Sequence, residues 1–199
     1  MNHWTLLPFA FLLGAVPFGY LVARAKGVNI FEAGSGNIGA TNVNRVLGAK
    51  AGLLVLFLDI AKGLAPALYG VHMLHSIESG LWLGLAAVLG HTFSPFLKFK
   101  GGKGVATTLG VVIGATPLVA LGSAVVFLPL LAMFRYVSLS SIVAAASLPL
   151  WDLLFKMPPV AIVFHSVIAA FILFKHRANI VRIRNGTESK FREKKEPEA

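Results

Sequence analysis

The polar stretch EAGSGNIGATNVNR, residues 32–45, has the residue types that bind an anion. Its glycines let backbone N–H groups approach a ligand closely, and glycine-rich turns with converging N–H groups form concave anion sites. Ser35 adds a hydroxyl, and Arg45 adds a fixed positive charge. Because two strongly apolar segments flank the stretch, it predicts a site for a phosphorylated substrate at a membrane surface. Further substrate-binding candidates in the stretch are Asn37, Thr41 and Asn42.

Two other interpretations of this stretch are a dinucleotide site and a flexible connection between helices. Gly34, Gly36 and Gly39 match the spacing GxGxxG, but a dinucleotide site needs a βαβ unit around that motif, and the flanking segments do not provide one. A flexible connection between helices is the second alternative. The many Asn and Thr residues that end in an arginine favour a binding role over plain flexibility.

The sequence KFKGGKG, residues 98–104, is a second candidate anion site. It is not a P-loop, because Leu97 stands where that motif has its first glycine and Gly104 replaces the Ser or Thr. Lys103 still supplies a charge, and a helix that begins at Gly104 would attract anions through its dipole. A basic membrane anchor would explain the first two lysines but not the glycines. The substrate-binding candidates here are Gly101, Gly102, Lys103 and Gly104.

A third polar segment follows the last apolar one and contains His176, Asn179 and Glu188. The first two are three residues apart, so a continued helix would place them on one face. His176 could accept a proton from an attacking hydroxyl or hydrogen-bond to a phosphate, and a merely interfacial histidine is the alternative. Asp59 and Lys62 also share a helix face, inside an apolar segment, which favours a structural ion pair over a transport relay.

The composition indicates a membrane protein. The chain has 199 residues, of which 56% are hydrophobic and 13% are charged, whereas soluble domains carry about 25% charged residues. The net charge of +10 then serves orientation in the membrane and attraction of anionic groups, and no nucleic-acid partner is expected. Cysteine is absent, and no cluster of His, Asp and Glu has ligand spacing, so we expect no metal site and no thioester on the protein.

Apolar segments of roughly 20 residues lie at 4–23, 51–70, 80–97, 137–150 and 158–174. The uncharged stretch 104–134 is ambiguous, because one helix would be about 45 Å long against a hydrocarbon core of about 30 Å. A single crossing there would also place the basic tail outside, against the positive-inside bias. We therefore expect two short helices, broken near Thr116-Pro117.

The chain is thus predicted to be an all-α integral membrane protein with seven transmembrane helices, an outside amino terminus and a cytoplasmic carboxyl terminus. Residues 1–199 would form one transmembrane domain, with a cytoplasmic tail at 175–199 whose motif part extends to about Glu188. Under this topology the three polar segments, at 30–50, 98–104 and 175–190, meet on the cytoplasmic face.

Together the three segments resemble the membrane-integral acyl-phosphate:glycerol-3-phosphate acyltransferase family of bacteria. The sequences GSGNIGATNVNR at 34–45, GHTFSPFLKFKGGKG at 90–104 and HRANIVRIRNGTE at 176–188 are similar to its three motifs. DIAKG at 59–63 also fits the family's pattern. The resemblance covers nearly the whole chain, with the motifs in the right order and at the right spacing.

The resemblance implies transfer of a fatty acyl group from acyl phosphate to the sn-1 hydroxyl of glycerol 3-phosphate. The products would be lysophosphatidic acid and phosphate, in phospholipid biosynthesis at the bacterial inner membrane, with no cofactor. It implies catalytic roles for Ser35, Arg45, His176 and Asn179, binding of glycerol 3-phosphate by the glycines of the second motif, and an important role, structural or not, for Glu188. Membrane lipid and a functional link to the enzyme that makes acyl phosphate are the further expected partners.

The rival class is a small phosphate-ester or anion transporter. A transporter needs a path through the helix bundle and commonly shows an internal repeat. The sequence has no recognisable repeat, and its polar motifs fall on one face, which favours the enzyme.

The topology can be tested with single cysteines, because the chain has none of its own. We expect a cysteine at Ser79 to react with an impermeant thiol reagent added outside intact cells. A cysteine at Gly101 should react only after the membrane is permeabilised. Labelling of both positions from the same side would contradict the seven-helix arrangement.

Overall fold

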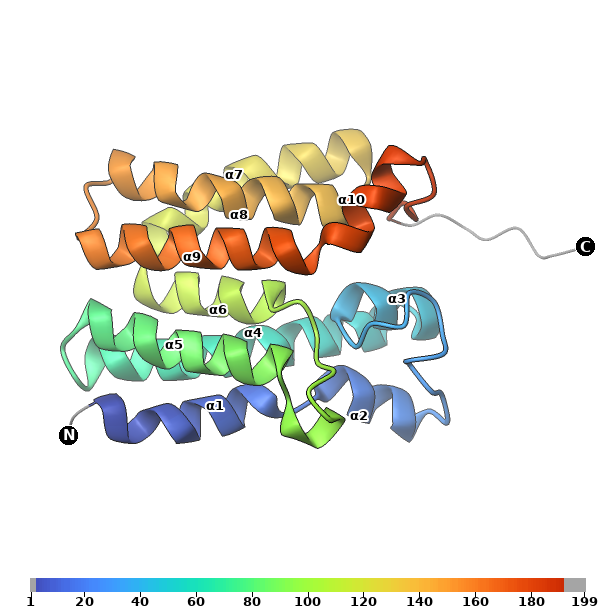
Figure 1. Cartoon of the computed structure of the whole chain (residues 1–199), viewed down its shortest axis with the longest axis horizontal. Helices are drawn as coiled ribbons and strands as arrows, with labels where there is room; N and C mark the ends of the chain where they lie inside the picture. Colours follow the sequence, from blue (N-terminus) through green and yellow to red (C-terminus); the bar gives the residue numbers. More distant parts are fainter. Residues whose placement is uncertain (1–2, 192–199) are drawn as a thin grey trace, which may run out of the picture.

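The computed structural model describes residues 3–191, and all of its regular elements in that range are helical (Figure 1). Residues 192–199, the end of the predicted cytoplasmic tail, lie outside the described part. The elements are η1 (His3–Leu6), α1 (Leu7–Ala15), α2 (Phe18–Ala25), α3 (Ala40–Leu47), α4 (Ala49–His72), α5 (Ile77–Thr92), η2 (Pro95–Leu97), α6 (Val105–Ala115), α7 (Pro117–Phe134), α8 (Val137–Leu154), α9 (Pro159–Lys175) and α10 (Arg177–Arg184).

Five helical segments within residues 3–191 are long and apolar enough to cross a membrane. A sixth is the pair α9 and α10, which is bent by 56° between Lys175 and Arg177. The apolar helix α6 is too short for the same criterion. The protein is therefore an all-helical integral membrane protein, as the composition predicts.

The break predicted near Thr116-Pro117 is confirmed. Helix α6 ends at Ala115 and α7 begins at Pro117, where the missing N–H of proline costs nothing in a first helical turn. The prediction of two short helices is wrong for the second one, because α7 has 18 residues and α6 has 11. Of the two helices only α6 is short, and most of its residues are buried in the bundle.

Small residues let the membrane helices approach closely. Gly63 of α4 lies against the backbone of Thr107, and Gly110 of α6 lies against the Ile60 carbonyl. An added methyl group at either glycine would fall 2.0 Å from a backbone oxygen. Close packing of this kind drives helix association in lipid, because the hydrophobic effect gives no driving force for association between apolar helices there.

The first apolar segment is broken in the middle, at Val16 and Pro17, between α1 and α2. A break frees backbone carbonyls that an unbroken helix would pair, and lipid offers no replacement donor. The carbonyl of Val16 accepts a hydrogen bond from Lys62 Nζ at 2.9 Å, and that of Ala15 accepts one from Ser94 Oγ at 2.6 Å. Buried polar side chains from two other segments therefore stabilise the break.

The ion pair predicted between Asp59 and Lys62 is present, with 2.8 Å between Asp59 Oδ1 and Lys62 Nζ. Both side chains are buried, at 2% and 3% exposure. His91 of α5 also approaches, with Nδ1 3.6 Å from the same carboxylate oxygen. The pair thus holds the ammonium group that caps Val16, which gives it a structural role.

A second buried polar pair joins α8 and α9. His165 Nδ1 lies 2.7 Å from Asp152 Oδ2, and neither side chain is exposed. The sequence predicts a packing or hydrogen-bonding role for this mid-helix histidine, and the contact between helices agrees with it.

Removal of Asp59 should be far more damaging than removal of a neutral cap. We expect Asp59→Asn to leave a buried ammonium without its counter-charge and to lower the free energy of unfolding by about 3 kcal/mol or more. Ser94→Ala, which removes one neutral hydrogen bond to the same helix break, should cost about 1 kcal/mol. Thermal unfolding of both variants in one detergent measures the difference. If Asp59→Asn is as stable as wild type but inactive, the pair is functional rather than structural.

Candidate active site

The three polar segments lie at one end of the helix bundle. Figure 1 shows α3, the loop that precedes α6, and α10 at the same end, which is opposite to η1. The described residues of the segments at 30–50, 98–104 and 175–190 are therefore brought together, as the charge pattern predicts. The site is built from these loops and from α8, which runs beside them.

The first loop is closed from within by Asn42. Its Oδ1 accepts a hydrogen bond from the Ser35 backbone N–H at 2.8 Å, and its Nδ2 donates to the carbonyls of Ala33 and Asn37 at 3.0 and 2.8 Å. The side chain is 2% exposed. Asn42 therefore shapes the loop instead of offering its amide to a substrate, in contrast to the prediction from sequence.

The remaining candidates of the first loop are placed differently. Asn37 Oδ1 accepts a hydrogen bond from the Gly39 N–H at 2.8 Å, at the start of α3. Ser35, Thr41 and Arg45 are exposed, so their side chains are available to a ligand. Gly34 and Gly36, with φ of +61° and +67°, supply the left-handed turns that present Ser35.

The glycines of the second loop serve close packing. The N–H groups of Gly101 and Gly102 donate to the carbonyls of Thr92 and His91, at 3.1 and 3.2 Å. A methyl group at Gly102 would lie 2.2 Å from His91 Nε2. The loop thus uses both N–H groups to dock on the end of α5. The predicted binding of substrate by Gly101 and Gly102 stays a prediction. Gly104, with φ of +83°, forms the left-handed cap at the start of α6.

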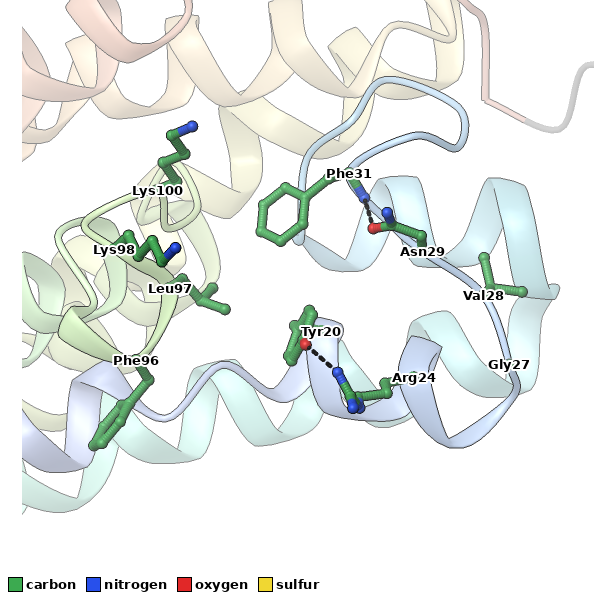
Figure 2. A pocket seen from close by; sticks show the side chains of 10 residues that line it. All are labelled: Tyr20, Arg24, Gly27, Val28, Asn29, Phe31, Phe96, Leu97, Lys98 and Lys100. Carbon is green, nitrogen blue, oxygen red and sulfur yellow. Dashed lines mark hydrogen bonds between the residues drawn. The ribbon is translucent and has the colours of Figure 1, made fainter.

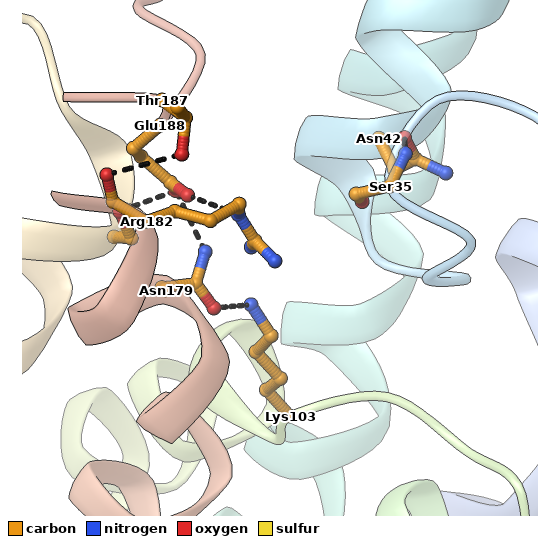
Figure 3. Close-up of polar contacts among 8 residues, drawn as sticks. Ser35, Asn42, Lys103, Asn179, Arg182, Thr187 and Glu188 are labelled. Carbon is orange, nitrogen blue, oxygen red and sulfur yellow. Dashed lines mark hydrogen bonds and ion pairs between the residues drawn. The ribbon is translucent and has the colours of Figure 1, made fainter. Parts of the chain in front are cut away.

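Lys103 leaves this docked loop and reaches the third segment. Its ammonium donates a hydrogen bond to Asn179 Oδ1. Asn179 Nδ2 in turn donates to Glu188 Oε1 at 2.6 Å (Figure 3). Residues 76 positions apart in the sequence are thus joined at the centre of the site.

Glu188 holds the cluster together through its contacts with three other side chains. Besides Asn179, it accepts a hydrogen bond from Ser138 Oγ at 2.7 Å and pairs with Arg182 Nε at 2.7 Å. The carboxylate thereby connects α8, α10 and, through Asn179, the second loop. Ser138 and Arg182 belong to the cluster through these contacts but were not among the candidates predicted from the sequence. Arg182 could have been selected because it is a basic residue within the third motif. A single serine in an apolar helix has no sequence pattern that indicates a role.

The electrostatics of the cluster favour an anionic ligand. Burial lowers the pKa of Lys103 to about 8, against the raising influence of Glu188, and the nearby charges of Arg182 and Arg45 lower it further. Burial alone would raise the pKa of Glu188, but hydrogen bonds from Ser138 and its other donors outweigh burial and lower it. The carboxylate therefore stays ionised, and the three cations Lys103, Arg182 and Arg45 outnumber this one anion.

His176 is buried, at 3% exposure, in the turn between α9 and α10. Its Nδ1 lies 2.8 Å from the Ile172 carbonyl, which can only accept, so Nδ1 carries a hydrogen. In a neutral ring this leaves Nε2 as an acceptor.

Two parts of the site stand opposite each other. In Figure 3, Ser35 of the first loop and Asn42 of α3 lie across from the cluster of Lys103, Asn179, Arg182 and Glu188. Lys103 and Arg182 place two cations on the side of the cluster, and Arg45 is near enough to act on Lys103. An arrangement of this kind can hold phosphate groups and stabilise negative charge that develops in a reaction.

A family model described as glycerol-3-phosphate acyltransferase matches residues 4–186. The chain belongs to this family. A glycerol-3-phosphate acyltransferase of Geobacter sulfurreducens is 46% identical over 192 residues, which cover 96% of this chain and 99% of that protein. One from Aquifex aeolicus is 48% identical over 193 residues, with 96% and 100% covered.

Two solved structures share the fold. Both are crystal structures of PlsY, an integral membrane glycerol 3-phosphate acyltransferase, one in a glycerol 3-phosphate form and one in a lysophosphatidic acid form. Each is 46% identical to this chain and covers 96% of both chains, with TM-scores of 0.92 and 0.88. The family predicted from the three motifs is thereby confirmed.

A methyl group at Gly102 should displace the loop that carries Lys103. We expect Gly102→Ala to raise KM for glycerol 3-phosphate at least tenfold, because the clash with His91 moves the lysine away from Asn179. Gly48→Ala is the control, since Gly48 has a positive φ, of +86°, which a side chain would strain, but no atom within 4 Å of the added methyl. The control should lose stability and keep its KM. Equal kinetic effects of both substitutions would contradict a specific role for the Gly102 contact.

Proposed function

We propose that this protein uses acyl phosphate to acylate the sn-1 hydroxyl of glycerol 3-phosphate, in phospholipid biosynthesis. Family membership supports acyl transfer to glycerol 3-phosphate with lysophosphatidic acid as product. The single observation that carries the rest is the cationic cluster joined by the Lys103–Asn179 hydrogen bond. Both substrates have an anionic phosphate, and this cluster offers fixed positive charge at the place where three polar segments meet.

In the proposed reaction the hydroxyl oxygen of glycerol 3-phosphate attacks the carbonyl carbon of acyl phosphate. A carbon–oxygen ester bond forms, the carbon–oxygen bond to the phosphate breaks, and the proton leaves with phosphate or through a base. Because the donor is already activated, neither a metal nor a cofactor is required. Convergent cations would stabilise the oxyanion and the departing phosphate.

Each site residue receives a role in this scheme. Lys103 and Arg45 hold phosphate groups, and Ser35 orients a substrate through its hydroxyl. Asn179 directs the Lys103 ammonium, and Glu188 anchors Asn179. His176, with Nε2 as acceptor, suits acceptance of a proton from the hydroxyl when the ring is neutral. Thr41 completes the polar lining of the first loop, while Asn42, Gly101 and Gly102 shape the loops that carry these groups.

The orientation in the membrane is also part of the proposal. Seven crossings arise if the broken pair α1 and α2 counts once and the short helix α6 crosses with the support of its neighbours. The site would then face the cytoplasm, as the Lys and Arg distribution favours. There it meets soluble glycerol 3-phosphate and the enzyme that makes acyl phosphate, which is the proposed functional partner.

The donor is tested with purified protein and labelled glycerol 3-phosphate. We expect labelled lysophosphatidic acid to form with acyl phosphate, together with one equivalent of free phosphate, and no turnover with acyl-CoA or acyl-carrier protein. The matched control is the same acyl chain on each donor. Turnover with a thioester and none with acyl phosphate would overturn the proposed donor.

The Lys103 ammonium should make substrate binding depend on pH. A lysine is charged below its pKa, here about 8, so its attraction for phosphate is lost as pH rises through that value. Between pH 7 and 9 we expect KM for glycerol 3-phosphate to rise by up to about tenfold, while the substrate, whose second ionisation is near pH 6, keeps its charge.

The control is Lys103→Arg, because a guanidinium stays charged throughout this range. Its KM should be flat with pH, whatever its absolute value. Lys103→Ala should raise KM more than it lowers kcat, since a non-reacting phosphate binds in both ground and transition states. A fall in kcat alone would place Lys103 at the reacting centre instead.

A further inference from the structure

A second cavity lies at the same end of the bundle, beside the site but separate from it. Its volume is about 820 Å³, and it opens between the end of α2, the loop that leads to the first polar segment, and the loop at 96–100 (Figure 2). None of the residues assigned to substrates or catalysis lines it. Its size falls in the range of small-molecule sites, and the proposed reaction leaves it without a role.

The cavity is lined by three cations and no acid among the described residues. Arg24 stands on one wall, and Lys98 and Lys100 stand on the other, as Figure 2 shows. The Arg24 guanidinium is held in place by a hydrogen bond to the Tyr20 hydroxyl at 2.8 Å and lies 6.0 Å from the centre of the same ring. Both lysines are exposed, so their charge is free to meet a ligand.

The rim of the cavity is aromatic and exposed. Phe96 is 61% exposed and Phe31 is 38% exposed, and the neighbouring Phe99 is 66% exposed. Aromatic side chains beside cations at the end of a membrane-crossing helix are suited to the headgroup region of a bilayer. Lys98 and Phe99 also have positive φ, of 51° and 63°. Two successive side chains are thus held in a costly backbone conformation at the edge of the cavity.

We propose that this cavity binds the phosphate headgroup of an anionic phospholipid of the surrounding bilayer. Basic pockets between membrane helices select such headgroups, because cations attract the phosphate while the acyl chains remain in lipid. The exposed phenylalanines favour a lipid over a soluble anion, which would gain nothing from them. A bound headgroup would connect α2 to the loop at 96–100 and so steady the segment that continues into Lys103.

The proposal is tested on the full chain in a neutral detergent, by titration with dioctanoyl phosphatidylglycerol or dioctanoyl phosphatidylcholine. A lipid that binds only the folded protein raises the thermal unfolding temperature as its concentration rises. We expect phosphatidylglycerol to do so and phosphatidylcholine to have little effect. The apparent Kd fitted to the rise with phosphatidylglycerol is called its midpoint below. In Lys98→Gln/Lys100→Gln the phosphatidylglycerol midpoint should rise about thirtyfold, from the usual contribution of two basic residues near anionic lipid.

Two further variants keep the test specific. Arg24→Gln removes the cation of the opposite wall and should also weaken the binding of phosphatidylglycerol, as the double lysine variant does. Lys50→Gln/Arg184→Gln removes two exposed charges from the same end, outside the cavity, and should leave the midpoint unchanged. Equal midpoints in cavity and control variants, or equal effects of the two lipids, would overturn the proposal. So would a raised KM for acyl phosphate with an unchanged phosphatidylglycerol midpoint, because the cavity would then serve the donor.

Discussion

The rest of the structure depends on the break in the first membrane-crossing helix. Carbonyls freed in a bilayer cannot turn to water, so the protein must supply donors. It does so with Lys62, paired to Asp59 on α4, and with Ser94, which lies just before the second polar loop. One interruption of backbone regularity therefore fixes α1, α4 and the start of that loop relative to one another. The loop that presents Lys103 begins from this anchored point.

The site itself is made of loops, and each loop is fastened by side chains that contact other parts of the protein. Asn42 closes the first loop on itself, His91 provides the surface on which the second loop docks, and Glu188 ties the third segment to α8. These contacts can hold exposed groups such as Ser35 and Arg45 in a defined position without a β-sheet to support them. Catalysis by positioning and charge needs this kind of order.

The coarse arrangement could be predicted because it follows from local rules. Charge parity and Pro117 locate the helix break, and three-residue spacing pairs Asp59 with Lys62. The roles of Asn42 and Gly102 could not be predicted, because residue type does not reveal whether an amide points inward or how closely two backbones approach. The contact of Ser138 with Glu188 depends on helices that only the tertiary structure brings together. The break at Pro17 could not be predicted, because the first apolar segment, which also contains Pro8 near its start, fits a continuous span.

The contacts of Glu188 have a consequence for how the protein becomes active during synthesis. This carboxylate meets Ser138, which lies 50 positions earlier, and Asn179 meets a lysine 76 positions earlier. A nascent chain that has already inserted its first helices has the two glycine-rich loops but lacks the segment that contacts the second loop and α8. The cluster can therefore assemble only after the segment with Asn179 and Glu188 has been synthesised. Until then the growing polypeptide is inserted in the membrane but its candidate active site is incomplete.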